Sequence, residues 1–283
     1  MKNNLGISII LTAYKAQDFI KEALDSIAAQ SWFKNNDNYE ILLGIDNCPE
    51  TLETVKNIMN DYKNLTVIYM KENYGTYVVS NTLISLAKYK WILRFDSDDI
   101  MRIDMVESIF DLISVQPKTD IIQFYFEKFS TTKEIKKQTN VAHGIICANK
   151  NTVYDIYGGY LPWKCAADTE LLTRLKSHVI FKEIPKILFY YRIHDKSLTQ
   201  NESTSMKSKL RMGYKKYIKT ESENNPIIKT VTGDYDIISK NETNTIVKHM
   251  QELEDKNTVK HIVMPVTKKE YLKLKRSHNY YGV

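Results

Sequence analysis

Short apolar runs alternate with amphipathic segments along the first third of the chain. The runs cover residues 7–12, 40–46, 65–70 and 91–95. In the segments between them, apolar side chains recur every three or four residues, as in a helix that buries one face. Runs of this length and composition are typical of strands buried on both faces of a sheet. Four strand–helix units with short connections predict an α/β fold, with a mostly parallel central sheet and helices on both faces.

The pattern after residue 100 is less regular and predicts shorter elements. The expected elements are a helix over 106–113, a strand over 120–126, antiparallel strands around Ile145 and Ile146, a helix from Asp168 through Lys176, a strand over 187–193 and a helix over 206–218. Beyond Ser222 the composition turns polar. We therefore expect a main domain over residues 1–220 and a small C-terminal extension over residues 221–283, which is basic and tyrosine-rich near its end.

The fourth apolar run stops abruptly at carboxylates. Asp96, Asp98 and Asp99 follow the run that begins at Trp91. In open α/β sheets, ligands bind beyond the carboxyl ends of the strands. Carboxylates crowded there repel one another unless a hard divalent cation joins them, and phosphates commonly complete its shell. The alternative is a solvated turn followed by a helix N-cap, and this stretch alone does not choose between the two.

The composition is that of a globular protein, and its cysteines and apolar runs indicate the compartment. The hydrophobic share of 43% and the charged share of 26% are ordinary for a globular domain. Three cysteines at no metal-like or disulfide-framework spacing indicate a reducing compartment. The apolar run at residues 7–11 is too short for a signal peptide or a membrane span. We therefore expect a cytoplasmic protein without a membrane span.

The formal net charge of +6 is concentrated in two clusters near the C-terminus. The first comprises Lys207, Lys209, Arg211, Lys215, Lys216 and Lys219, and the second comprises Lys268, Lys269, Lys273, Lys275 and Arg276. Such patches bind phosphates, nucleic acid or an anionic membrane surface, although a solvated helix face has the same appearance. Peripheral membrane contact is therefore one interpretation of these clusters.

Short motifs along the chain follow one another in a distinctive order and spacing. They are the turn Thr12-Ala13-Tyr14 after the first strand, Asp46 at the end of the second, the loop Asn73-Tyr74-Gly75, the helix residue Asn81 and the Asp-x-Asp motif Asp96-Ser97-Asp98. Together they resemble the family 2 glycosyltransferases, from about Ile7 to about Ser197. The resemblance implies the GT-A (nucleotide-diphospho-sugar transferase) fold and an inverting, non-processive enzyme.

The resemblance also implies a donor site for a nucleotide-diphosphate sugar, with a UDP-sugar as the expected donor. Its implied donor-binding residues are Thr12, Ala13, Tyr14, Asp46, Asn73, Gly75, Asn81, Asp96, Ser97 and Arg192. Tyr14 is expected to pack near the nucleobase and Asp46 to accept a hydrogen bond from it, although a loop aromatic and a turn carboxylate are the alternatives. A divalent metal, Mn²⁺ or Mg²⁺, is expected at Asp98, Asp96 and His194, where it would neutralise the charge on the leaving diphosphate.

An inverting transferase needs a general base for the acceptor hydroxyl. In the family this is the Asp of a Glu-Asp pair that opens a helix, and Asp168 matches that position. Ala167 replaces the usual Glu, so Glu170 stays as a second candidate base. Asp168 also suits a helix N-cap, and a cap can be a base at the same time. Ser80 is a further departure, since many members have an Arg there.

Several acceptors and functions fit the sequence. We expect an enzyme that acts on a saccharide, a lipid-linked sugar or a protein. The alternatives are a glycosyltransferase that acts on nucleic acid, such as a modified DNA base, through the basic C-terminal part, and a non-catalytic nucleotide-sugar binding module. A nucleotidyltransferase is disfavoured because no Gly-rich phosphate loop follows the first strand. No Gln-x-x-Arg-Trp motif follows Asp168, which disfavours a processive synthase.

Overall fold

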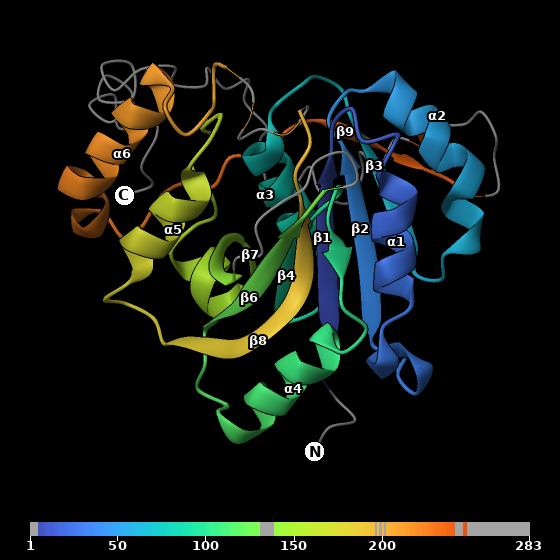
Figure 1. Ribbon diagram of the computed structural model, residues 1–283, viewed down its shortest axis with the longest axis horizontal. Coiled ribbons are helices and arrows are strands. Elements are labelled where there is room, and N and C mark those ends of the chain that lie inside the picture. The colour runs from blue at the N-terminus through green and yellow to red at the C-terminus, as the bar shows by residue number, and fades with distance from the viewer. Residues whose placement is uncertain are drawn as a thin grey trace.

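One continuous mixed sheet forms the centre of the computed structural model (Figure 1). The structure describes residues 5–130, 139–195, 197, 200, 202–240 and 246–247. In this part of the chain the strand order is β10-β9-β3-β2-β1-β4-β7-β6-β8-β5. The sheet therefore joins strands from the whole length of the described chain.

The four apolar runs predicted as strands form the parallel part of the sheet. They are β1 (Ile7–Ala13), β2 (Tyr39–Ile45), β3 (Leu65–Met70) and β4 (Trp91–Asp96). Strand β1 lies between β2 and β4, and Thr12 is paired with Gly44 on one side and with Asp96 on the other. The carboxyl ends of these strands therefore lie at one edge of the sheet, as predicted, and this edge carries the candidate site.

The other half of the sheet is mixed. Strand β7 (Thr139–Asn149) runs antiparallel to both β4 and β6 (Ile121–Phe129), and β8 (Phe181–Arg192) runs parallel to β6. The short strand β5 (Ile100–Met101) pairs with β8. Strand β8 begins six residues before the expected start at residue 187. Its first half alternates two partly buried apolar residues, Phe181 and Ile184, with charged residues and a proline, so no continuous apolar run marks it.

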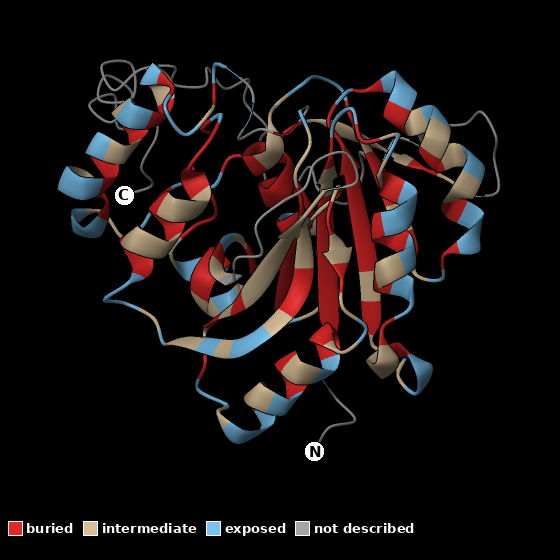
Figure 2. Ribbon diagram, viewed as in Figure 1, coloured by how far each residue is buried: buried red, intermediate tan, exposed pale blue. Residues whose placement is uncertain are grey.

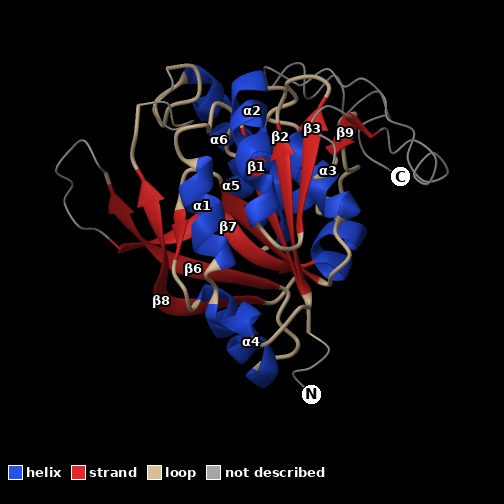
Figure 3. Ribbon diagram, turned by 90° about the vertical axis from the view of Figure 1, so that its right-hand side faces the viewer, coloured by secondary structure: helices blue, strands red, loops and turns tan. Residues whose placement is uncertain are grey.

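Helices cover both faces of the sheet, as predicted. One apolar cluster contains residues of α1 (Ile20–Ala28), α2 (Pro49–Ile58) and α4 (Met105–Val115), and a second contains residues of α3 (Thr76–Leu86), α5 (Ala167–Leu175) and α6 (Lys209–Glu221). Figure 3 shows α1 and α3 on opposite sides of the parallel strands. The parallel strands β1 and β2 are buried along almost their whole length (Figure 2), as expected for strands covered on both faces.

Short helices connect the main elements. The 3₁₀ segments are η2 (Ser31–Lys34), η3 (Met59–Asp61) and η5 (Ser222–Asn224), and η4 (Lys150–Ile156) has π-helical hydrogen bonding. In the described residues, no helix is both long and apolar enough to cross a membrane.

The segment after residue 220 joins the same fold. Strand β9 (Tyr235–Ile238) pairs antiparallel with β3, and β10 (Ile246–Val247) pairs with β9. Ile228 and Val231 are buried beside the main domain. Part of the expected C-terminal extension, residues 226–238, thus packs onto the sheet of the main domain, and the boundary at residue 220 stays a prediction. The basic cluster at 268–276 and its neighbouring tyrosines lie outside the described residues.

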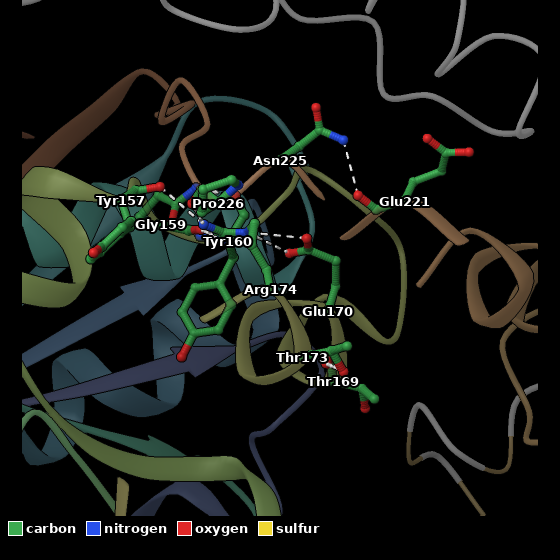
Figure 4. A network of polar contacts seen from close by, with 11 residues as sticks. Tyr157, Gly159, Tyr160, Thr169, Glu170, Thr173, Arg174, Glu221, Asn225 and Pro226 are labelled. Atoms are coloured by element: carbon green, nitrogen blue, oxygen red, sulfur yellow. Dashed lines mark hydrogen bonds and ion pairs between the residues drawn. The ribbon is translucent and has the colours of Figure 1, made fainter. Parts of the chain in front are cut away.

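A buried ion pair anchors α5 (Figure 4). Arg174 Nε lies 3.0 Å from Glu170 Oε1, and both side chains are 1% exposed. The guanidinium also donates to the carbonyl oxygens of Tyr157, Gly159 and Pro226. Burying two charges is unfavourable unless their remaining hydrogen-bonding groups are satisfied, and here the guanidinium bonds to three carbonyl groups. The pair therefore fixes α5 to two other segments of the chain.

Candidate active site

The loop after β3 is bound by the carboxylate that ends β2. Asp46 Oδ1 accepts a hydrogen bond from the Tyr74 N–H at 2.7 Å, and Oδ2 accepts one from the Gly75 N–H at 2.9 Å. Asn73 Nδ2 donates to the Asp46 carbonyl oxygen at 3.2 Å. Gly75 has a φ of 84°, a conformation that favours glycine. The predicted residues Asp46, Asn73 and Gly75 therefore form one unit.

Asp46 is 3% exposed, and its protonation reflects this burial. Burial raises the pKa of Asp46 to about 6, and the two backbone N–H groups of Tyr74 and Gly75 only partly oppose the rise. A carboxyl group with such a pKa changes its charge within a mildly acidic range. It is therefore a pH-sensitive group at the edge where the donor is expected.

The turn after β1 runs beside the turn after β2. The Asp46 N–H donates to the Ala13 carbonyl oxygen at 2.9 Å, and the Lys15 N–H donates to Cys48 Sγ at 3.4 Å. Between these contacts the Tyr14 side chain is 51% exposed. An exposed aromatic ring held between two backbone contacts is suited to stacking on a planar ligand.

A buried guanidinium connects the Asp-x-Asp motif to α3. Arg94 Nη2 lies 2.9 Å from Asp96 Oδ1 and donates to Thr76 Oγ1 at 3.2 Å. Its Nε donates to Ser80 Oγ at 3.4 Å, and Thr76 Oγ1 lies 2.6 Å from Thr12 Oγ1. Sequence analysis did not identify Arg94, although a charged residue inside an apolar strand was a signal. Ser80, the departure from the family pattern, leaves room on α3 for this guanidinium.

Asp168 lies at the start of α5 and faces the same space as Asp96. Its Oδ1 accepts hydrogen bonds from the Tyr77 hydroxyl at 3.1 Å and from the Thr169 N–H at 2.8 Å. A Cβ atom built on Gly144 would lie 3.3 Å from Asp168 Oδ2 and 3.9 Å from Asp96 Oδ2. The fold therefore brings the candidate base and the Asp-x-Asp motif together beside one glycine, with Arg94 Nη1 3.4 Å from the same Cβ position.

Glu170 and Asn81 are bound by protein groups in this structure, and the roles expected for them stay predictions. Glu170 is buried and bound by Arg174 (Figure 4). By contrast, Oδ2 of Asp168 lies close to Gly144. The amide of buried Asn81 donates to the Tyr160 and Val231 carbonyl oxygens and accepts from the Tyr160 N–H. Both side chains are thus bound by protein groups in the interior.

The second half of the Asp-x-Asp turn is bound by the end of β8. Arg192 Nε donates to the Asp98 carbonyl oxygen at 2.8 Å, and the Arg192 N–H donates to Asp99 Oδ1 at 2.8 Å. The Arg192 guanidinium is paired with Glu22 of α1 and lies over the ring of Phe19. Arg192 therefore holds the turn through Asp98 and Asp99, and its predicted contact with the diphosphate stays a prediction.

Buried carboxyl groups flank Asp98. Burial raises the pKa of Asp99 well above its usual range, and the carboxylates of Asp98 and Asp96 raise it further. Burial also raises the pKa of Asp96, against the lowering effect of Arg94. Ser97, between them, is buried. The turn therefore crowds three carboxyl groups together, and the side chains of Asp96 and Asp98 stay about 30% and 28% exposed.

Asp98 and His194 present donor atoms suited to a metal ion. His194 Nε2 lies 2.8 Å from Asp98 Oδ2, and the His194 ring packs on Phe19 with centroids 4.5 Å apart. Oxygen and imidazole donors suit a manganese-type ion. The described residues hold no group of three or more His, Cys, Asp or Glu arranged for a metal. A cation here would thus take its remaining ligands from a phosphate or water.

Comparison with known proteins decides the family. The sequence model described as "Glycosyl transferase family 2" matches residues 8–199. The chain belongs to glycosyl transferase family 2. The match covers more than half of the chain and ends just after the β8 segment that holds the Asp-x-Asp turn. The predicted family is confirmed.

This family 2 chain is similar to a curated enzyme over a limited length. It is 35% identical over 97 residues to the Poly(ribitol-phosphate) beta-glucosyltransferase of Bacillus spizizenii, which is 34% of this chain and 15% of that enzyme. The chain spans between 15% and 42% of the lengths of five curated relatives that it matches.

Solved structures share the fold. S. aureus TarS in complex with UDP has a TM-score of 0.56 at 19% identity, covering 68% of this chain and 61% of that chain. Mannosyltransferase PcManGT from Pyrobaculum calidifontis, in complex with GDP-Man and Mn²⁺, has a TM-score of 0.55 at 17% identity, covering 68% and 58%. At these identities the comparison bears on the fold alone, and the predicted GT-A fold is confirmed.

Proposed function

We propose that this family 2 protein is an inverting, metal-dependent glycosyltransferase that moves one sugar from a nucleotide-diphosphate sugar to an acceptor hydroxyl. The observation that carries the proposal is the approach of Asp168 and Asp96 to one point beside Gly144. A carboxylate able to accept a proton thereby faces the motif that is expected to hold the donor diphosphate. Acid–base chemistry and donor binding need this proximity.

The donor nucleotide is proposed to lie between Tyr14 and Asp46. An ionised carboxylate only accepts hydrogen bonds, so Asp46 favours a base with an imide or amide N–H on its Watson–Crick edge. Uracil has such a group at N3, whereas cytosine has an acceptor nitrogen there and donates only from its exocyclic amino group, which favours a UDP-sugar over a CDP-sugar. The likeness to TarS, solved with UDP and with UDP-GlcNAc, supports the same choice.

The metal ion is proposed to be Mn²⁺ or Mg²⁺ at Asp98 and His194, with Asp96 beside them. The 2.8 Å contact between Asp98 Oδ2 and His194 Nε2 supplies two suitable donor atoms on one side of the turn. Such an ion supplies Lewis-acid stabilisation of charge on the departing nucleoside diphosphate. Arg94 holds Asp96 by an ion pair and so keeps the motif in place.

Asp168 is proposed to take the proton from the acceptor hydroxyl. Its hydrogen bonds from Tyr77 and Thr169 both fall on Oδ1. Oδ2 is the oxygen nearer to Gly144, and Arg94 Nη1 lies near the same point. Tyr77 and the start of α5 therefore orient the carboxylate while Oδ2 stays available for the acceptor. Glu170 is not part of this proposal, because Arg174 binds it inside the protein.

The acceptor is proposed to be a saccharide, a lipid-linked sugar or a protein. Lysines 209, 216 and 219 are exposed on α6, whereas Arg211 is buried and donates to the Thr204 carbonyl oxygen. Part of the first basic cluster is thus a structural contact. A nucleic-acid acceptor and peripheral membrane contact stay predictions from the sequence.

The donor site is tested by measuring the thermal stability of the protein with UDP, GDP, CDP and dTDP, each with and without Mn²⁺. A ligand that binds the folded state raises the melting temperature by mass action. We expect the largest rise with UDP and Mn²⁺, and a smaller one with CDP. The absence of a rise with every nucleotide would contradict the proposed donor site.

The role of Asp46 is tested by repeating the UDP titration between pH 5 and pH 8. The pKa of Asp46 is about 6, so its carboxylate is protonated at lower pH. The protonated group then has one acceptor fewer for the N–H of the nucleobase. We expect UDP affinity to fall as the pH drops through about 6. Asp46→Asn is the control, because any pH dependence that it retains belongs to the diphosphate. An identical profile in both proteins would exclude Asp46 from base recognition.

Tyr77→Phe tests whether the Tyr77 hydroxyl orients Asp168, the proposed general base. The change removes the hydroxyl that donates to Asp168 Oδ1 and leaves the buried ring in place. A hydrogen bond to a charged group is worth about 1.5–3 kcal/mol, so we expect kcat to fall roughly tenfold to a hundredfold with an unchanged donor KM. Tyr160→Phe is the matched control, since this ring is equally buried and lies 5.5 Å from that of Tyr77. Equal kcat losses in the two variants would remove Tyr77 from this role.

A further inference from the structure

A segment beyond the family match connects the two halves of the candidate site. We call residues 226–238 the C-terminal brace. The match ends at residue 199, and the brace runs from α5 across α3 to the edge of β3. Figure 1 shows β9, the last part of the brace, beside β3. Its contacts, taken in order along the chain, lead from the helix of the proposed base to the loop of the proposed donor site.

The first part of the brace is bound to the segment around α5. The Pro226 carbonyl oxygen accepts a hydrogen bond from Arg174 Nη1 at 2.9 Å (Figure 4). The Ile228 N–H donates to the Tyr157 carbonyl oxygen at 3.0 Å. Arg174 also binds that same carbonyl oxygen at 2.9 Å. The buried Glu170–Arg174 pair therefore fixes the start of the brace to the helix that carries Asp168.

The middle of the brace is bound to α3. The Val231 carbonyl oxygen accepts from Asn81 Nδ2 at 3.0 Å, and the Gly233 N–H donates to Thr82 Oγ1 at 2.9 Å. Both partners on α3 are about 1% exposed. Leaving buried polar groups without hydrogen bonds costs free energy of folding. These two bonds therefore specify where the brace crosses α3.

The last part of the brace lies against the loop that binds Asp46. The Lys71 N–H donates to the Asp234 carbonyl oxygen at 3.0 Å, and Met70 of β3 pairs with Tyr235. A Cβ atom on Gly233 would lie 2.6 Å from Tyr74 Cδ2, closer than any side chain allows. The Tyr74 ring therefore occupies the space that the absent side chain of Gly233 leaves.

We propose that the C-terminal brace positions the loop of residues 73–75 for binding of the donor nucleotide, through the contact between Gly233 and Tyr74. The Tyr74 N–H donates to Asp46 Oδ1, so a displaced ring would move the carboxylate that faces the nucleobase. Connecting loops are mobile unless they are held, and a loop that is already ordered loses less entropy when a ligand binds. This inference rests on the proposed donor site.

Gly233→Ala tests the brace. The added methyl group displaces the Tyr74 ring, and we expect the Kd for UDP with Mn²⁺ to rise about tenfold. The donor KM rises to the same extent, while kcat at saturating donor stays within about twofold, because α5 and Asp168 are not moved. Calorimetric titration with UDP and steady-state kinetics measure these values. A purely structural role would lower the melting temperature and leave KM unchanged.

Two further variants complete the test. Gly213→Ala on α6 is the matched control, because its new Cβ meets nothing within 4 Å, and it is expected to bind UDP like the parent protein. Gly233→Ala combined with Tyr74→Leu removes the contact with the ring and leaves Met70 Cε, 2.7 Å from the new Cβ and at the end of a flexible side chain. We expect this double variant to bind UDP more tightly than Gly233→Ala alone. If Gly233→Ala does not fold, Thr82→Val removes the acceptor for the Gly233 N–H and is expected to raise the Kd for UDP at least about threefold.

The outcomes separate the two proposals. If the parent protein binds UDP and Gly233→Ala, or Thr82→Val in its place, binds it equally well, the brace has no role in donor binding. If the double variant binds UDP no more tightly than Gly233→Ala, the brace does not act on donor binding through the contact with Tyr74. If the parent protein binds no nucleotide at all, the proposed donor site itself is wrong, and the inference falls with it.

Discussion

Asp168→Asn is expected to reduce kcat about a hundredfold to ten-thousandfold, the range that general-base catalysis contributes. Asparagine keeps an oxygen that accepts hydrogen bonds from Tyr77 and Thr169, so the start of α5 retains its geometry. What is lost is the ability to take a proton from the acceptor. The Kd for UDP is therefore expected to stay within about twofold, and single-turnover kinetics with titration calorimetry measure both quantities.

Glu170→Gln is the comparison for this prediction. The change leaves Arg174 with a buried charge that lacks its partner, and breaking such a pair costs roughly 3–5 kcal/mol. We expect a lower free energy of unfolding, measured in urea, with a much smaller effect on kcat than in Asp168→Asn. Undiminished transfer by Asp168→Asn, or a larger kcat loss in Glu170→Gln, would assign the base to another residue.

Asp98→Ala is expected to abolish the part of UDP binding that depends on Mn²⁺. The change removes the carboxylate that lies 2.8 Å from His194 Nε2, while the Asp98 carbonyl group that Arg192 binds is retained. Stabilisation of transition-state charge by a metal is worth several kcal/mol, so kcat/KM is expected to fall at least about a thousandfold. Titration with UDP in the presence and absence of Mn²⁺ measures the loss directly.

Asp37→Asn is the matched control for Asp98→Ala. Asp37 is an exposed carboxylate that pairs with Lys63, and exposed pairs contribute little to stability. It is expected to keep the effect of Mn²⁺ on UDP binding. If Asp98→Ala also keeps it, the metal ion is not held at this turn.

The segments of the candidate site were predictable from the sequence because each follows a simple local pattern. Asp46 and Asp96 each end an apolar run, and the loop of residues 73–75 follows another. Parallel strands bring their carboxyl ends to one edge, so these segments meet without further information. The match of residues 8–199 to the family agrees with this expectation.

The contacts inside the site were not predictable in this way. Tyr77 and Asp168 are 91 positions apart, and Arg94 reaches a carbonyl group 50 positions away at Gly144. No local periodicity relates such residues, because the pairings β4–β7 and β6–β7 decide which side chains meet. The place of residues 226–238 gave still less signal, since they bury only a few apolar side chains and most of their hydrogen bonds use backbone groups, which carry no side-chain pattern.

The amino-acid pattern specified a parallel α/β core and the edge at which its polar segments gather, since strand burial and strand direction follow from the order of apolar runs. It left open which carboxylate of α5 faces that edge. Asp168 and Glu170 are two positions apart on a helix and so point in nearly opposite directions. The buried guanidinium of Arg174 binds Glu170 and thereby turns Asp168 toward Gly144. That choice depends on charges and packing contributed by distant segments, which come together only when the chain folds.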